Sequence, residues 1–181
     1  MHYATIKKHD VANGTGVRVS LFVSGCTHHC KNCFNEEAWD FSYGKEYTDA
    51  VTEEILTALS PDYIRGLSLL GGEPFDPHNQ EEVLRLLRRF KARYPEKDVW
   101  CYTGYDLEKE LLSGKLEQPE RIREMLSMID ILVDGRFVDE LKNPKLRFKG
   151  SSNQRIIRAK DSLKAGKLIR WEDDLHNPPQ G

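Results

Sequence analysis

Residues 25–35 read Gly25-Cys26-Thr27-His28-His29-Cys30-Lys31-Asn32-Cys33-Phe34-Asn35 and hold three of the four cysteines of the 181-residue chain. The spacing C-x3-C-x2-C lets one short loop present three sulfurs to one centre, so it indicates metal binding rather than disulfide pairing. With His28 or His29 as a fourth ligand, the loop would form a Cys3His zinc site. With iron and sulfide it would hold a 4Fe-4S cluster in which one iron has no protein ligand. The fourth cysteine, Cys101, lies in an apolar run and is expected to be a buried free thiol.

Composition limits the number of domains and the kinds of partner. The chain is 39% hydrophobic and 31% charged, which allows one compact core and is too short for two ordinary domains. Its 27 basic and 29 acidic side chains give a net charge of -2, so charge does not favour nucleic acid or an anionic membrane. No apolar run approaches the ~20 residues that span a bilayer, and residues 1–8 lack the core of a secretion signal. We expect a cytoplasmic protein with neither nucleic-acid nor membrane partners.

Strands and helices alternate in the hydrophobic pattern. The pattern predicts strands at 17–23, 64–70, 99–103 and 129–134, a fifth from about 155, and helices at 48–59, 79–94, 106–112 and 119–128. This order predicts an α/β fold with a mainly parallel sheet and right-handed crossovers. A complete eight-unit barrel takes about 250 residues, so we expect a partial, laterally open (βα) barrel. Its open side would admit a peptide loop of another protein.

The domain boundary is expected near residue 160. We assign residues 1–160 to a single domain and residues 161–181 to a partly irregular C-terminal tail. Two prolines make helix or strand unfavourable over residues 177–181. Trp171 belongs to an apolar cluster of the tail and is expected to dock on the sheet edge or on a partner.

A second motif, Gly71-Gly72-Glu73-Pro74, directly follows the predicted strand at 64–70. Glycines have no side chain, so they expose backbone amides and carbonyls to a close ligand, and Pro74 fixes the exit of the turn. Alone, the motif fits an ordinary strand-to-helix turn. About forty residues after the cysteine loop, and at the same end of a parallel sheet, it favours a binding site.

Together, the cysteine loop after a first strand and the Gly-Gly-Glu-Pro turn resemble the radical S-adenosylmethionine enzymes. In detail, three stretches resemble the activases of anaerobic ribonucleotide reductases: G-C-x-H-x-C-x-x-C-F-N at 25–35, W-x-Y-T-G-Y at 100–105 and V-D-G-R-F at 133–137. The resemblance covers most of residues 1–160. Many radical enzymes carry an aromatic residue just before the third cysteine. This chain has Asn32 there and Phe34 after it, which fits the activase subfamily.

The resemblance implies a radical S-adenosylmethionine domain and an anaerobic oxidoreductase. Cys26, Cys30 and Cys33 would hold a 4Fe-4S cluster, and S-adenosylmethionine would chelate the open iron. An electron from a low-potential donor such as flavodoxin would cleave the cofactor. The 5'-deoxyadenosyl radical would then remove a hydrogen atom from a glycine of the anaerobic ribonucleotide reductase and leave a glycyl radical. No side chain is expected to act as a general acid or base.

By the same resemblance, further residues are candidates for binding the cofactor. Gly71, Gly72 and Glu73 would contact its amino group, and Arg136, with Asp134, its carboxylate. The remaining candidates share a position near the predicted rim: Asn32, Phe34, His28, Tyr105, Asn153 and Arg155. Each also has an ordinary explanation, such as a surface ion pair for Asp134 and Arg136 or burial for Phe34. Trp100 and Tyr102 are expected in the core.

Other functions fit part of the pattern. The chain could activate another glycyl radical enzyme, such as pyruvate formate-lyase, or modify a small molecule as the short deazaguanine synthases do. From a different class, it could be a zinc-stabilised binding module or a pure electron-transfer protein. Neither of these two requires the Gly-Gly-Glu-Pro turn at its position, so both are less favoured.

Overall fold

The computed structural model describes residues 1–176, which form a mixed α/β fold around an open seven-stranded sheet of order β3-β1-β2-β4-β5-β6-β7. The strands are β1 His2–Asp10, β2 Val17–Val23, β3 Lys45–Glu46, β4 Ile64–Gly71, β5 Asp98–Tyr102, β6 Ile131–Asp134 and β7 Arg155–Arg158. Strands β2, β4, β5 and β6 are parallel neighbours. Strands β1, β3 and β7 pair antiparallel at the two sides. The predicted parallel sheet is therefore confirmed for the core.

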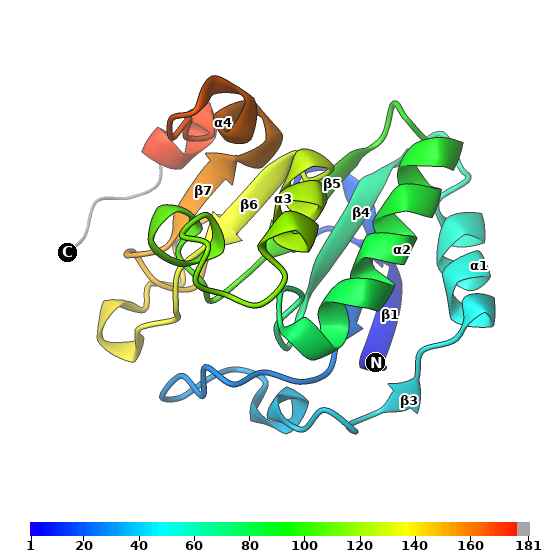
Figure 1. Ribbon diagram of the computed structural model, residues 1–181, viewed down its shortest axis with the longest axis horizontal. Coiled ribbons are helices and arrows are strands. Elements are labelled where there is room, and N and C mark those ends of the chain that lie inside the picture. Colours follow the sequence, from blue (N-terminus) through cyan, green and yellow to red (C-terminus); the bar gives the residue numbers. More distant parts are fainter. Residues whose placement is uncertain (177–181) are drawn as a thin grey trace.

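Helices cover one face of this sheet (Figure 1). They are α1 Asp49–Ala58, α2 Pro77–Arg93, α3 Pro119–Ser127 and α4 Ala159–Ala165. Because side chains alternate along a strand, Val19, Leu21 and Val23 of β2 join the core beneath the helices. Arg18 and Ser20 alternate with them and are also fully buried. The sheet therefore has an apolar face under the helices and a second face that buries polar groups.

Arg18 anchors that second face. Its guanidinium lies 2.6 Å from Asp98 and donates hydrogen bonds to the Ser68 hydroxyl (2.7 Å) and the Leu67 carbonyl (3.0 Å). A buried guanidinium needs such partners, since an unpaired charge in the interior is strongly unfavourable. The Ser68 hydroxyl donates in turn to the carbonyl of Asn13 (2.6 Å), which ties the loop before β2 to this face.

Strands β1 and β3 and helix α4 are absent from the sequence prediction. Strand β1 ends in Lys7-Lys8-His9-Asp10 and lacks an apolar run, and β3 has only two residues, so neither has a local signal. Both form because they pair in register with a neighbour. The predicted helix at 106–112 is a π-helical turn, Leu107–Leu111, in which the Leu112 amide donates to the Leu107 carbonyl (2.8 Å).

The described part of the predicted tail packs on the sheet. Helix α4 crosses the predicted boundary at residue 160. Trp171 is buried against Trp100 in an edge-to-face contact, with ring centroids 5.4 Å apart. Docking of Trp171 on the sheet is thus confirmed, whereas the irregular stretch predicted at 177–181 lies outside the described residues. No helix within residues 1–176 combines the length and apolar character that a membrane crossing requires.

Candidate metal centre

A cavity of about 340 Å³ opens at the carboxyl ends of β2, β4, β5 and β6. The predicted site residues that line it are Cys26, His28, Cys30, Cys33, Phe34, Gly71, Gly72 and Glu73. The structure therefore brings the cysteine loop and the Gly-Gly-Glu-Pro turn to one place. They meet because they follow β2 and β4, which are adjacent parallel strands.

Backbone hydrogen bonds hold the cysteine loop against the turn. The Gly72 amide donates to the Val23 carbonyl (2.7 Å), and the Glu73 amide donates to the Gly25 carbonyl (2.8 Å). A Cβ on Gly72 would lie 2.5 Å from the Gly25 oxygen. Gly72 is therefore required for the close approach of the two segments, which gives the first part of the motif a physical reason.

Glu73 connects three segments of the site. Its carboxylate is buried and accepts hydrogen bonds from the Thr103 hydroxyl (2.9 Å) and from the amides of Gly104 (2.8 Å) and Phe75 (3.0 Å). Nε2 of His28 lies 2.7 Å from the same carboxylate. These four donors use most of the acceptor capacity of a carboxylate. Glu73 therefore positions the cysteine loop, the turn and the end of β5 relative to one another.

All three loop cysteines are free thiols that are partly buried. Burial raises the pKa of Cys26 to about 11, and the negative charge of Glu73 acts in the same direction. Burial also raises the pKa of Cys30. Since metal ligation requires thiolates, loading of this loop would release protons. Cys101 is fully buried under the helices, as predicted, and burial raises its pKa as well.

The available donors bear on the two metals considered for the loop. A structural zinc site takes four tetrahedral protein ligands, so the three thiols would need a fourth donor. His28, a candidate fourth zinc ligand, has its Nε2 engaged by Glu73. In a four-iron cluster each thiolate binds a different iron, so three free thiols fit such a cluster with one iron left open.

Six predicted residues do not line the cavity. Asn32 donates to Asp139 (2.9 Å), and Arg136 pairs with Glu110 (2.6 Å). Tyr105 is buried with its ring edge against His28. Asn153 donates to the Arg136 carbonyl (2.8 Å), whereas Asp134 and Arg155 pair with each other (2.7 Å). Gly135, Phe137 and Gln154, which neighbour several of these six, line the cavity instead.

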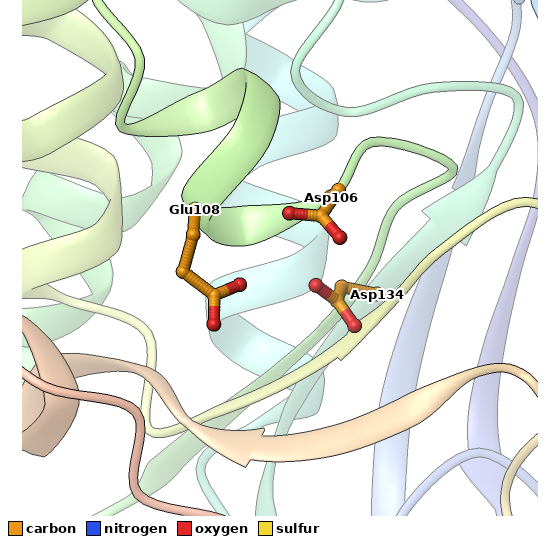
Figure 2. A group of neighbouring side chains, drawn as sticks. All are labelled: Asp106, Glu108 and Asp134. Atoms are coloured by element: carbon orange, nitrogen blue, oxygen red, sulfur yellow. The ribbon is translucent and has the colours of Figure 1, made fainter.

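Asp134 also belongs to a group of three carboxylates with Asp106 and Glu108, whose oxygens lie within 4.8 Å of one another. Figure 2 shows the three side chains converging between the π-helical turn and the end of β6. The guanidinium of Arg155 pairs with all three: it donates to Asp134 and Glu108 and lies 3.6 Å from Asp106. Its hydrogen bonds lower the pKa of Glu108, and the carboxylates raise the pKa of Arg155. The group is therefore an ion-pair network built around one guanidinium.

Sequence reasoning missed several residues that line the cavity. Tyr102 was expected only in the core, yet it lies in the cavity floor with Phe22, Leu70 and Val133. These four occupy the strand positions that alternate with the helix-facing residues, so the period of two could have identified them. Trp39 also lines the cavity, and no local pattern marks it.

Comparison with known proteins identifies similar chains. A family described as "4Fe-4S single cluster domain" matches residues 12–157. The chain is 42% identical over 162 residues to the anaerobic ribonucleoside-triphosphate reductase-activating protein of Haemophilus influenzae, which covers 88% of this chain and 99% of the relative. It is 40% identical over 156 residues to the protein of that name from Escherichia coli K12, covering 85% and 96%. The protein of that name from Enterobacteria phage T4 is 41% identical over 156 residues, covering 86% and 93%.

Proposed function

The chain belongs to the family of anaerobic ribonucleoside-triphosphate reductase-activating proteins, and from this premise we propose that it is an iron-sulfur enzyme that generates a glycyl radical on an anaerobic ribonucleotide reductase. The observation that carries the proposal is the cavity in which three free thiols meet the Gly-Gly-Glu-Pro turn. Four-thiolate clusters suit electron transfer alone. A four-iron cluster held by three thiolates leaves one iron free to bind a ligand that the protein does not supply.

Cys26, Cys30 and Cys33 would hold a 4Fe-4S cluster, with S-adenosylmethionine on the open iron. When bound, the two groups supply one-electron cleavage of a carbon-sulfur bond and removal of a hydrogen atom from a glycine of the reductase. The protein supplies position and a site shielded from water. A low-potential protein such as flavodoxin would donate the electron.

The residues around the cavity divide into two groups. Gly71 and Gly72 line it and would offer backbone groups to the amino group of the cofactor, whereas Glu73 is largely engaged by its four donors and positions the turn. Phe34 lines the cavity, with the residue 73% exposed, and would cover the cofactor or contact the partner. Asn32, Tyr105, Asp134, Arg136, Asn153 and Arg155 do not line the cavity and would act indirectly, through their neighbours.

We also propose that the sheet is a partial, laterally open barrel of the radical S-adenosylmethionine type, formed by a single domain over residues 1–160. Four parallel strands with the cysteine loop at their carboxyl ends support this assignment. The open edge gives a peptide loop of the reductase a route to the cavity. We place the reaction in the reducing cytoplasm, where the thiols would stay available for iron.

The test is anaerobic reconstitution with iron and sulfide, followed by dithionite and S-adenosylmethionine. Cys30→Ala is the critical variant and Cys101→Ala is its matched control, because Cys101 lies in the core away from the cavity. We expect the wild type and Cys101→Ala to be brown, to bind about four irons per chain and to form 5'-deoxyadenosine. Cys30→Ala should lose the product. Formation of 5'-deoxyadenosine by Cys30→Ala at the wild-type rate would refute the proposed centre.

The partner is tested by electron paramagnetic resonance of mixtures with a glycyl radical protein. A glycyl radical doublet should develop on the anaerobic ribonucleotide reductase and not on pyruvate formate-lyase. The opposite preference would assign the chain to another activase class.

A further inference from the structure

Unpartnered buried polar atoms gather at the cavity. Buried side-chain donors and acceptors nearly always have a hydrogen-bond partner. Within residues 1–176, the side-chain atoms without one are Trp39 Nε1, Gln80 Oε1, Asp98 Oδ1 and Tyr102 OH. Asp98 is paired with the Arg18 guanidinium at 2.6 Å. Of the remaining three residues, Trp39 and Tyr102 line the cavity, which indicates that a bound group completes their hydrogen bonding.

Trp39 is held beside the first cysteine by two contacts. Its carbonyl accepts a hydrogen bond from the Cys26 amide (3.3 Å). Its ring stacks on His29, with centroids 4.3 Å apart and planes 16° apart. Trp39 also ends the 3-10 turn Glu36–Trp39 that follows the cysteine loop. The indole is therefore fixed to the segment that carries the thiols.

The chemistry of the indole restricts its missing partner. Indole Nε1 is a donor only, so the partner must be an acceptor, and anionic acceptors form the stronger hydrogen bonds. The groups that the cysteine loop would bring into this cavity are thiolate and sulfide sulfurs. We propose that the Trp39 N–H donates a hydrogen bond to a sulfur of the cluster held by Cys26, Cys30 and Cys33. This inference rests on the proposed function.

Such a hydrogen bond makes the cluster easier to reduce. Reduction adds negative charge to the sulfurs, and a donor aimed at them stabilises the more negative state. Trp39 would thereby be a positioning and tuning residue. Removing the N–H should lower the reduction potential, so that the ratio of reduced to oxidised cluster falls several-fold at a fixed applied potential.

Trp39→Phe tests the inference, because phenylalanine keeps a ring against His29 and removes the donor. Trp171→Phe is the matched control, since Trp171 packs on Trp100 and does not line the cavity. The first readout is the ultraviolet resonance Raman band that reports indole hydrogen bonding, compared between metal-free and reconstituted protein. We expect reconstitution to shift this band toward a stronger hydrogen bond in the wild type and in Trp171→Phe, but not in Trp39→Phe. The second readout is a redox titration without S-adenosylmethionine, in which only Trp39→Phe should shift to a lower potential.

Several results would overturn the inference. One is an unchanged potential in Trp39→Phe with full iron content. Another is a Raman shift that develops only after S-adenosylmethionine is added, because the donor would then serve the cofactor. If Trp39→Phe fails to bind iron, the wild-type and Trp171→Phe spectra still decide, since absence of the shift on reconstitution refutes the hydrogen bond. Failure of the proposed function is separate: it would appear as a reconstituted protein that does not cleave S-adenosylmethionine.

Discussion

The substitution Glu73→Gln keeps the shape of the side chain that joins the cysteine loop to the sheet and removes its charge. In the wild type, one carboxylate oxygen faces His28 Nε2 and the Gly104 amide, and the other faces the Phe75 amide. The Thr103 hydroxyl lies 2.9 Å from both oxygens. A glutamine amide has one acceptor oxygen, and its nitrogen can only donate. In either orientation, therefore, the amide nitrogen faces a backbone N–H.

The expected cost follows from that mismatch. A hydrogen bond to a charged acceptor contributes about 1.5–3 kcal/mol, and a buried donor left without a partner costs about 1–3 kcal/mol. The side chain of Glu73 is about 1% exposed, so water cannot replace the lost acceptor. The side chains of Thr103 and His28 can reorient to pair with the glutamine amide. The loss is therefore limited to the hydrogen bond of one backbone N–H. We expect Glu73→Gln to lower the free energy of unfolding by about 3 kcal/mol.

The assay is urea unfolding of the metal-free, reduced protein, so that iron binding does not contribute to the stability. Glu54→Gln is the control, because Glu54 is an exposed partner of Lys8 and such surface substitutions stay within about 0.5 kcal/mol. Hydrogen exchange should also accelerate at the Gly104 or Phe75 amide in Glu73→Gln. If the two variants unfolded at the same urea concentration, the carboxylate would not be the link between loop and sheet.

Three further predictions concern the same region and the sheet beneath it. Tyr102→Phe should raise the free energy of unfolding by about 1 kcal/mol, because it removes a buried hydroxyl without a partner. Tyr47→Phe, which loses a 2.8 Å hydrogen bond to a threonine hydroxyl, should lower it by about as much; equal signs in urea unfolding would contradict the assignment. Gly72→Ala should reduce iron uptake, since its Cβ would lie 2.5 Å from a carbonyl of the cysteine loop. Gly114→Ala, whose Cβ meets nothing within 4 Å, should load iron as the wild type does despite a φ of +75°. Burial opposes ionisation of Asp130, but hydrogen bonds from an α4 ammonium group and a β5 amide outweigh it and lower its pKa. The stability from this shift is present above the unfolded pKa of about 3.9 and is lost as pH falls through the lower folded value. Acid titration of Asp130→Asn should therefore show a smaller loss of stability below about pH 4, and a loss equal to that of the wild type would refute the coupling.

Strong local patterns predicted the centre of the fold, and pairing across the sheet decided the rest. Strands such as 17–23 are apolar runs next to turn residues, and adjacent parallel strands bring the loops at their carboxyl ends together. That reasoning places Cys26 and Gly72 in one site, and both line the cavity. Strand β1 lacks such a run, and it forms only because β2 offers a partner.

Side-chain partners account for the residues that sequence reasoning placed differently. Arg136 and Glu110 are 26 positions apart, and nothing in either segment predicts that they pair. Trp39 likewise has no periodic signal, and its position depends on how the chain returns to the cysteine loop after residue 35. Short-range patterns therefore located the cysteines and glycines that line the cavity, and long-range contacts determined which residues surround them.

The link between His28, Glu73 and Thr103 has a consequence for how the protein matures. All three loop cysteines leave the ribosome about 40 residues ahead of Glu73, a delay of roughly 2–8 s at 5–20 residues per second. Throughout that interval the Gly-Gly-Glu-Pro turn and β5, which hold the cysteine loop in the folded protein, have not yet been synthesised. Iron delivery is therefore expected to follow release and folding of the chain, and a fragment that stops short of Glu73 would carry the ligands without the frame that orders them.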